Sequence, residues 1–78
     1  MLKRIRHPMP DFVSAALVRR GLMKAYRERP PYQRNDYIGW IVRAKREDTK
    51  QKRLNQMLDE LEDGHLYMKM KYRVLLIL

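Results

Sequence analysis

Two amphipathic helices can be read from residues 31–64, PYQRNDYIGWIVRAKREDTKQKRLNQMLDELEDG. The first half carries apolar residues at helical spacing, namely Tyr37, Ile38, Trp40, Ile41 and Ala44. In the second half the i, i+3, i+4, i+7 pattern is formed by Leu54, Met57, Leu58 and Leu61. Apolar side chains at these spacings share one face of a helix. The stretch therefore predicts two helices with apolar stripes that can pack together.

Turn and capping residues predict where these helices begin and end. Neither Pro30 nor Pro31 supplies a backbone donor, so the pair ends any helix before it and suits the first turn of the next. Near Glu47 we expect a break, because Asp48 and Gln51 resemble a capping box in which each side chain satisfies a backbone donor. We expect Gly64 to end the second helix as a left-handed residue.

Two shorter helices are predicted before Pro30. Pro10 suits a first helical turn, and an apolar face continues to Gly21 through Phe12, Val13, Ala16 and Leu17. Residues 22–29 form a second, short helix that ends at the proline pair. Residues 1–9 are basic and show no sustained period, so we interpret them as a flexible arm. Residues 10–64 then form one helical domain.

The periodicity changes after Gly64. Leu66, Met68, Met70 and Tyr72 alternate with more polar neighbours, as on a half-buried strand. Because a lone strand has no partner, residues 65–78 either lie extended over the bundle, pair with a second copy in a homodimer, or remain disordered. The predicted fold is all-α: a small bundle of about four helices with a flexible basic arm and an extended, strand-like tail.

Composition narrows the class of protein. The chain has 78 residues, which suits one domain, and it has no cysteine, which excludes disulfides and thiolate chemistry. The longest apolar run, residues 74–78, is far shorter than a membrane span. No apolar core of a signal peptide follows the basic first residues, so we expect a cytoplasmic protein. The net charge of +9 favours acidic partners.

The residues that could perform catalysis are few and scattered. The chain has one serine, Ser14, one threonine, Thr49, and two histidines, His7 and His65, which are far apart in sequence. No nucleophile and base stand at a recognisable spacing, and no metal-ligand pattern is present. Four acidic residues near the end of the last helix point in different directions and are expected to be solvated, namely Asp59, Glu60, Glu62 and Asp63. We therefore predict a protein that is not an enzyme and needs no cofactor or metal.

A basic cluster is the candidate binding site. It lies at the turn between the two long helices and comprises Arg43, Lys45, Arg46, Lys50, Lys52 and Arg53. The N-terminus of the following helix adds partial positive charge, so this turn suits a phosphate, a carboxylate or a lipid headgroup. The alternative is a solvated face that serves only solubility.

The aromatic residues have two interpretations. Trp40, Tyr26, Tyr32 and Tyr37 could form a stacking platform for nucleic-acid bases, interleaved with arginines. Aromatic residues at helical spacing more commonly belong to the core, and we favour that interpretation for Trp40. We expect Tyr32 to be the most exposed of the four.

Several residue pairs resemble a known family. The pattern consists of Pro31-Tyr32 with Arg34 and Tyr37, Trp40-Ile41, Ala44-Lys45, Thr49 to Arg53, Leu58 and Gly64. It resembles the C-terminal helical region of the YdeI/OmpD-associated family, also described as bacteriocin-protection proteins. Lys50 departs from it, since the family usually has arginine there, and lysine loses the two-pronged geometry that Arg53 keeps. The resemblance implies a link to envelope stress or antimicrobial-peptide resistance.

Two functions follow as expectations. The first is a non-enzymatic helical interaction module of this family with a protein partner. The alternative is binding of nucleic acid or another polyanion through the arm and the basic cluster, with an affinity that falls steeply with salt. The acidic residues from Asp59 onward would repel a phosphate backbone along the last helix, which disfavours a helix-turn-helix mode.

Overall fold

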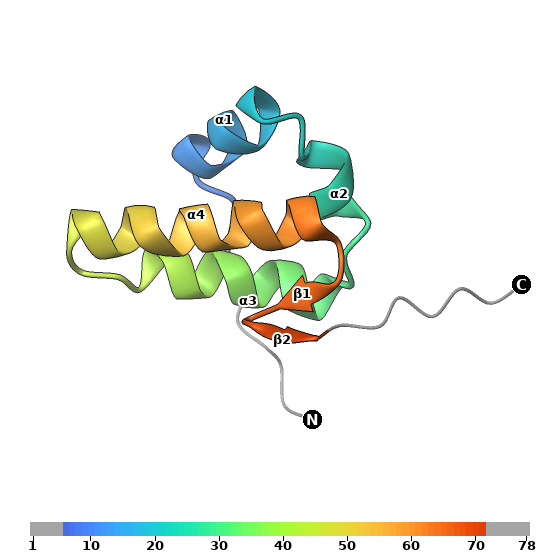
Figure 1. The fold of residues 1–78 in the computed structure, drawn as a ribbon. Coiled ribbons are helices and arrows are strands. Elements are labelled where there is room, and N and C mark those ends of the chain that lie inside the picture. Colours follow the sequence, from blue (N-terminus) through green and yellow to red (C-terminus); the bar gives the residue numbers. More distant parts are fainter. Residues whose placement is uncertain (1–5, 72–78) are drawn as a thin grey trace, which may run out of the picture.

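Four helices and a β-hairpin make up residues 6–71, the part of the chain that the computed structural model describes. The elements are α1 (Asp11–Arg19), α2 (Met23–Arg27), α3 (Pro31–Val42), α4 (Glu47–Asp63), β1 (Leu66–Tyr67) and β2 (Met70–Lys71). In Figure 1, α3 and α4 run antiparallel side by side, α1 and α2 cover one side of this pair, and the hairpin follows the end of α4. The predicted all-α bundle of about four helices is confirmed.

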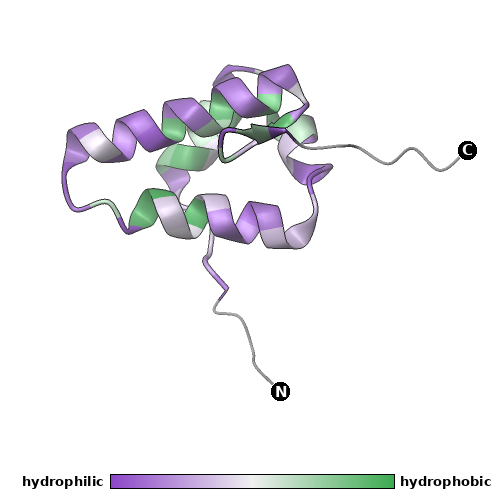
Figure 2. Ribbon diagram, turned by 60° about the horizontal axis from the view of Figure 1, so that its bottom comes forward, coloured by the Kyte–Doolittle hydropathy of each residue, from purple (hydrophilic) through white to green (hydrophobic). Residues whose placement is uncertain are grey.

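The core lies between α3 and α4 and is closed by α1 and α2. Its central side chains, all buried, are Val13, Leu17, Tyr37, Ile38, Ile41, Leu54, Met57, Leu58 and Leu61. Figure 2 shows apolar segments on the inner sides of the helices and hydrophilic segments outside. The apolar stripes predicted for residues 37–44 and 54–61 therefore form the core, while Trp40 is only partly buried at its edge.

Gly64, at the end of α4, takes the predicted left-handed conformation, and Gly21, after α1, takes the same conformation. Gly21 has φ +68° and Gly64 has φ +85°, both in the left-handed region that residues with a Cβ rarely adopt. A Cβ at either position would meet nothing within 4 Å, so backbone conformation and not space favours glycine there. α1 and α4 accordingly end just before these residues.

The capping box predicted at Asp48 is wrong. α4 begins at Glu47, and Arg46 is its N-cap residue without a side-chain capping bond. Asp48 thus lies inside the first turn, where its carboxylate accepts a hydrogen bond from the backbone N–H of Thr49 at 2.8 Å. The helix starts earlier because Glu47 and Asp48 both interact favourably with the positive end of its dipole.

The segment after Gly64 folds back on itself. Leu66 pairs with Lys71 and Tyr67 with Met70, while Met68 and Lys69 form the two-residue turn with φ of 50° and 65°. Positive φ at both turn residues is the geometry that joins antiparallel strands tightly. The described part of the tail is therefore a hairpin. The predicted lone strand is wrong, because its two halves pair with each other. Residues 72–78, with the apolar run 74–78, lie outside the described residues.

Part of the predicted arm lies against the bundle. The backbone N–H of His7 donates a 2.8 Å hydrogen bond to Oδ1 of Asn35 in α3, and Met9 packs against the core. Residues 1–5 lie outside the described range. Between residues 6 and 71, no helix combines the length and apolar character needed to cross a bilayer.

Candidate anion-binding site

The predicted basic cluster, called here the turn cluster, lies at the α3–α4 connection as expected. Three of its side chains are engaged within the chain. Nη1 of Arg53 donates a 2.6 Å hydrogen bond to the carbonyl of Trp40 and its guanidinium lies 5.3 Å from the Trp40 ring centre. Nζ of Lys50 lies 5.9 Å from the ring centre of Phe12, and Arg46 pairs with Asp48 at 3.3 Å.

Half of the turn cluster is therefore engaged within the chain, and the contacts of Arg53 have a structural role. A guanidinium that donates to the carbonyl at the end of α3 and lies over an aromatic ring fixes α4 against α3. The capacity of Arg53 to grip an external anion is reduced accordingly. The other three side chains, Arg43, Lys45 and Lys52, are exposed and form no hydrogen bond or ion pair with residues 6–71.

The acidic end of α4 was predicted to be solvated, and for Glu60 this is wrong. Glu60 is 3% exposed. Its carboxylate accepts hydrogen bonds from the Tyr37 hydroxyl and from the backbone N–H groups of Met68 and Lys69, at 2.9 and 2.7 Å for the latter two. Gln56 donates a further bond at 3.2 Å. A buried carboxylate must be hydrogen-bonded, and this one joins the hairpin to α3 and α4.

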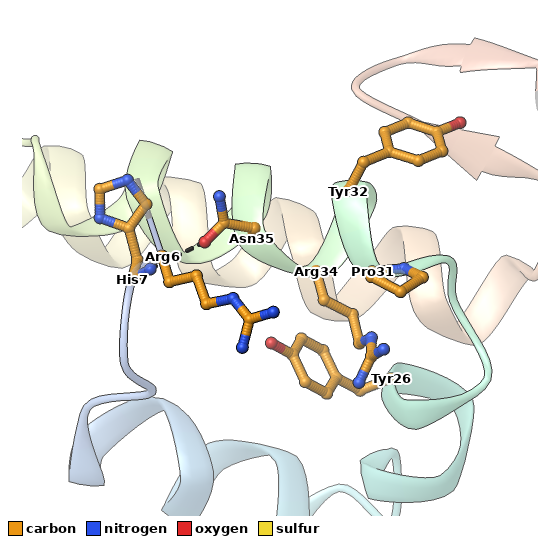
Figure 3. A pocket seen from close by; sticks show the side chains of 7 residues that line it. All are labelled: Arg6, His7, Tyr26, Pro31, Tyr32, Arg34 and Asn35. Carbon is orange, nitrogen blue, oxygen red and sulfur yellow. Dashed lines mark hydrogen bonds between the residues drawn. The ribbon is translucent and has the colours of Figure 1, made fainter. Parts of the chain in front are cut away.

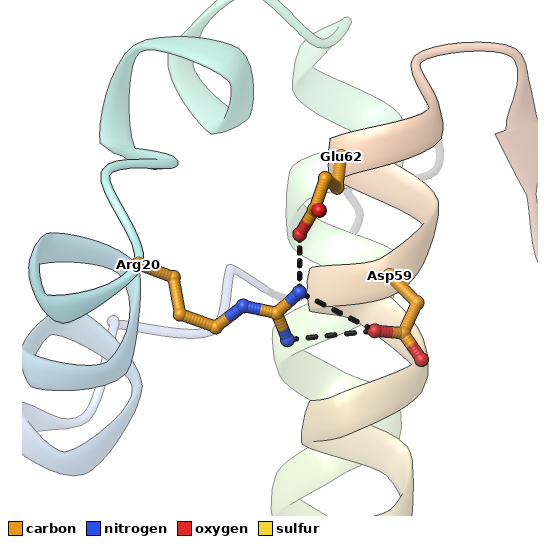
Figure 4. Close-up of polar contacts among 3 residues, drawn as sticks. All are labelled: Arg20, Asp59 and Glu62. Atoms are coloured by element: carbon orange, nitrogen blue, oxygen red, sulfur yellow. Dashed lines mark hydrogen bonds and ion pairs between the residues drawn. The ribbon is translucent and has the colours of Figure 1, made fainter.

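The neighbouring acidic side chains are neutralised by Arg20. Its guanidinium lies 3.4 Å from Asp59 and also bonds Glu62, so one cation from the end of α1 bridges two carboxylates of α4 (Figure 4). A basic group from within the chain therefore compensates both carboxylates. These pairs are solvent-exposed, which makes their contribution to stability small.

A second basic site, which we call the arm cleft, was not predicted. It has a volume of about 800 Å³ and lies between the arm, α2 and the first turn of α3. Its lining residues are Arg6, His7, Tyr26, Pro31, Tyr32, Arg34 and Asn35. In Figure 3 the side chains of Arg6 and Arg34 both extend toward the space beside Tyr26.

The arm cleft is rich in hydrogen-bond donors and has no acidic lining residue. Nε of Arg34 is buried and has no hydrogen-bond partner. Burial raises the pKa of the Tyr26 hydroxyl, although the nearby Arg34 charge acts in the opposite direction. Tyr26 is therefore a neutral phenol at pH 7, able to donate a hydrogen bond. The cleft offers two guanidinium groups and a phenol to an acceptor.

Gly39 explains how the arm reaches this position. A Cβ at Gly39 would lie 2.7 Å from two atoms of the His7 ring and 3.3 Å from Nη1 of Arg43. The ring therefore occupies the space left by the missing side chain, one turn along α3 from Asn35. Arg43 of the turn cluster lies another turn along α3, and its Nη1 also lies near this position.

Sequence reasoning missed the arm cleft because its residues come from three separate segments. One signal was present: a glycine inside a helix is destabilising by roughly 0.5–1 kcal/mol relative to alanine, so Gly39 required a reason. Of the possible nucleophiles, neither Ser14 nor Thr49 lines the cleft. Among the described residues, no group of three potential metal ligands is found.

A comparison with protein-family models identifies the family. The model described as bacteriocin-protection, YdeI or OmpD-associated matches residues 7–64. The resemblance seen in residues 31–64 is thereby confirmed, and the match extends it through α2 and α1 to His7. No curated protein and no solved structure matches the chain.

Proposed function

This chain belongs to the bacteriocin-protection, YdeI or OmpD-associated family, and we propose that it is a non-enzymatic module that binds an acidic surface of a protein partner in the cytoplasm. The observation that carries the proposal is an imbalance in how charges are paired. Arg43, Lys45 and Lys52 are exposed and unpaired within residues 6–71. Of the four acidic residues in the last turns of α4, Asp59 and Glu62 are paired with Arg20 and Glu60 is buried, while Asp63 is exposed and accepts a hydrogen bond from the backbone N–H of His65.

This imbalance favours an external acidic partner. Asp59 and Glu62 are held by Arg20, and Glu60 is buried in its own network. The positive charge at the α3–α4 turn is therefore not cancelled by the acidic end of α4. Complementary charge accelerates encounter with an acidic partner and sets its orientation. The same positive charge repels cationic peptides, so any protection against them would be indirect.

The test compares two charge variants of the full chain. The turn variant carries Arg43→Gln, Lys45→Gln and Lys52→Gln. The matched control carries Arg19→Gln, Lys24→Gln and Arg27→Gln, three exposed cations of α1 and α2, so both lose the same charge. Quantitative proximity labelling in cells, followed by affinity measurement with the purified partner, should show a partner that the turn variant loses and the control keeps.

Equal loss in both variants, or no partner that depends on the turn, would contradict the proposal. Thermal unfolding of both variants verifies that the fold is intact. Surface substitutions of this kind change the free energy of unfolding by only about 0.5 kcal/mol each.

Nucleic acid is the second candidate, favoured by the same three unpaired cations. The ion pairs of Arg20 also weaken the repulsion that Asp59 and Glu62 would exert on a phosphate backbone. Titration with short duplex DNA and RNA at low and physiological salt separates the two functions. A protein-binding module should bind nucleic acid only at low salt, and equally in both triple variants. Tight binding at physiological salt that the turn variant loses would establish the second candidate instead.

A further inference from the structure

We propose that the arm cleft is a binding site for a phosphate monoester carried by a small molecule, separate from the protein-binding surface at the turn. The phosphate group would lie between the guanidinium groups of Arg6 and Arg34, with the Tyr26 hydroxyl as a further donor. The organic part of the ligand would rest against Pro31 and Tyr32 at the rim.

The charge of the cleft favours an anionic ligand. Two arginines line it, and no carboxylate lies among the lining residues to neutralise them. The cleft also adjoins the first turn of α3, where the helix dipole adds partial positive charge. Two cations held near one another without an intervening anion repel each other, and a bound anion removes that repulsion.

An unsatisfied donor points to the same class of ligand. Nε of Arg34 is buried without an acceptor, and a buried donor that lacks a partner destabilises the structure. A ligand oxygen that draws the guanidinium slightly into the cleft would give this donor an acceptor. The edge of a guanidinium that carries Nε matches two oxygens of an oxyanion, which makes a two-pronged contact the expected mode.

The number of charges and donors fits a phosphate better than a carboxylate. A phosphate monoester carries about −1.5 to −2 charges at pH 7 and has three strong acceptor oxygens. A carboxylate carries one charge on two oxygens, so it neutralises only one of the two guanidinium charges. Two guanidinium groups and a phenol therefore match the charge and the acceptors of a phosphate.

The rim of the cleft suits the organic part of such a ligand. Tyr32 is 45% exposed and its ring packs edge-on against Tyr67 of β1, with ring centres 5.9 Å apart. The ring is thus fixed in place while a large part of it remains accessible. Pro31 beside it adds a rigid apolar surface.

The test is an NMR titration of the full chain, labelled with ¹⁵N, with inorganic phosphate and separately with acetate at constant ionic strength. Phosphate should shift the amide signals of residues 6–7 and 32–35 saturably. Acetate should bind at least about tenfold more weakly, because it forms fewer charge-assisted hydrogen bonds. Equal affinities for the two anions, or shifts that never saturate, would overturn the proposal.

Single-charge variants locate the site. Arg34→Gln and Arg6→Gln should each weaken phosphate binding about tenfold or more, and Arg34→Lys should lie between Arg34→Gln and the unmodified chain because it keeps the charge but not the fork. Arg27→Gln is the matched control: Arg27 is exposed on α2, outside the cleft, and its loss should leave the affinity unchanged. Equal weakening by Arg27→Gln would reduce the effect to general surface charge and overturn the site.

Two further measurements keep the result unambiguous. Amide spectra without phosphate show whether Arg34→Gln retains the fold, and Arg6→Gln, an exposed position, tests the site independently. The turn variant should bind phosphate with unchanged affinity. If it loses phosphate binding, the anion binds at the turn and the arm cleft is not the site.

Discussion

The two sides of α3 differ in whether their polar side chains have partners within the chain. On the side that faces the hairpin, the Asp36 carboxylate accepts a 2.6 Å hydrogen bond from Tyr67, and the Tyr37 hydroxyl donates to the buried Glu60. On the side that faces the arm, Arg34 and Arg6 line a cleft without an acidic residue. On the hairpin side the carboxylates are therefore hydrogen-bonded within the chain. On the arm side no carboxylate lines the cleft to neutralise the two arginines.

This difference separates structural polar groups from candidate binding groups. A buried carboxylate is expensive unless every oxygen is bonded, and Glu60 meets that condition. Its network holds the hairpin to the bundle and leaves nothing for a ligand. The arm side has donors to spare, which is costly for stability but suits recognition of an anion. The predictions that follow test each side of α3 separately, beginning with the largest effect.

Loss of the Glu60 carboxylate should have the largest effect. Glu60→Ala removes the acceptor for the Tyr37 hydroxyl and for the amides of Met68 and Lys69, so we expect the free energy of unfolding to fall by about 3 kcal/mol. Urea denaturation measures this change, and faster hydrogen exchange at Met68 and Lys69 would show that the hairpin is released.

The control for this variant is Glu62→Ala, which removes an exposed carboxylate two residues away that pairs only with Arg20 at the surface. Its effect should stay below about 1 kcal/mol, because exposed ion pairs contribute little. Similar losses in the two variants would show that the buried network is not what holds the hairpin.

Alkaline pH should weaken the same network through Tyr37. Burial, together with the hydrogen bond to Glu60, raises the pKa of its hydroxyl well above the ordinary value of 10. Above pH 10 the unfolded chain loses this proton while the folded chain keeps it, so stability falls as pH rises. Below pH 10 the contribution is fully present.

The variant Tyr37→Phe measures this effect directly. At pH 7 it should be less stable than the unmodified chain by about 2 kcal/mol, the value of a hydrogen bond to a charged group. Between pH 10 and 12 the difference should shrink by up to about 1.4 kcal/mol per pH unit. Parallel stability curves for the two proteins over this range, from urea denaturation at each pH, would contradict the assignment.

The hairpin side and the arm side also differ in how far the sequence predicts them. The apolar stripes of α3 and α4 and the stop at Gly64 follow from local periodicity and backbone preference. The Glu60 network does not, because its donors lie 23, 8 and 9 residues away in the chain. The hairpin turn was hidden as well, since Met68 and Lys69 take positive φ without the glycine or asparagine that marks such turns.

The candidate site was predicted in part. The exposed cations of the turn cluster could be located from sequence, since a basic run beside a helix start is visible there. The hydrogen bond from Arg53 to Trp40 could not be predicted, because it spans a turn whose geometry the sequence does not give. The arm cleft depends on the arm being fixed to Asn35, a contact between residues 28 positions apart. Whether the turn cluster binds a partner stays a prediction.

Of these variants, Gly39→Ala should change the free energy of unfolding least, while it displaces the arm from α3. Alanine favours the interior of α3 by roughly 0.5–1 kcal/mol relative to glycine. The new Cβ would lie 2.7 Å from the His7 ring, so the ring must move away. Because that ring belongs to the arm and not to the core, its displacement should lower the free energy of unfolding only slightly. We therefore expect the free energy of unfolding, measured by urea denaturation, to be unchanged or slightly higher.

Phosphate binding should fall in the same variant, because displacing His7 moves Arg6 away from Arg34. The amide signals of His7 and Asn35 should shift even before phosphate is added. This combination, an equal or more stable fold with weaker anion binding, would show that glycine is placed at position 39 for the arm and not for the helix. A variant that is more stable and still binds phosphate with full affinity would show that the arm's position on α3 has no part in the site, and Arg34 alone would then have to account for binding.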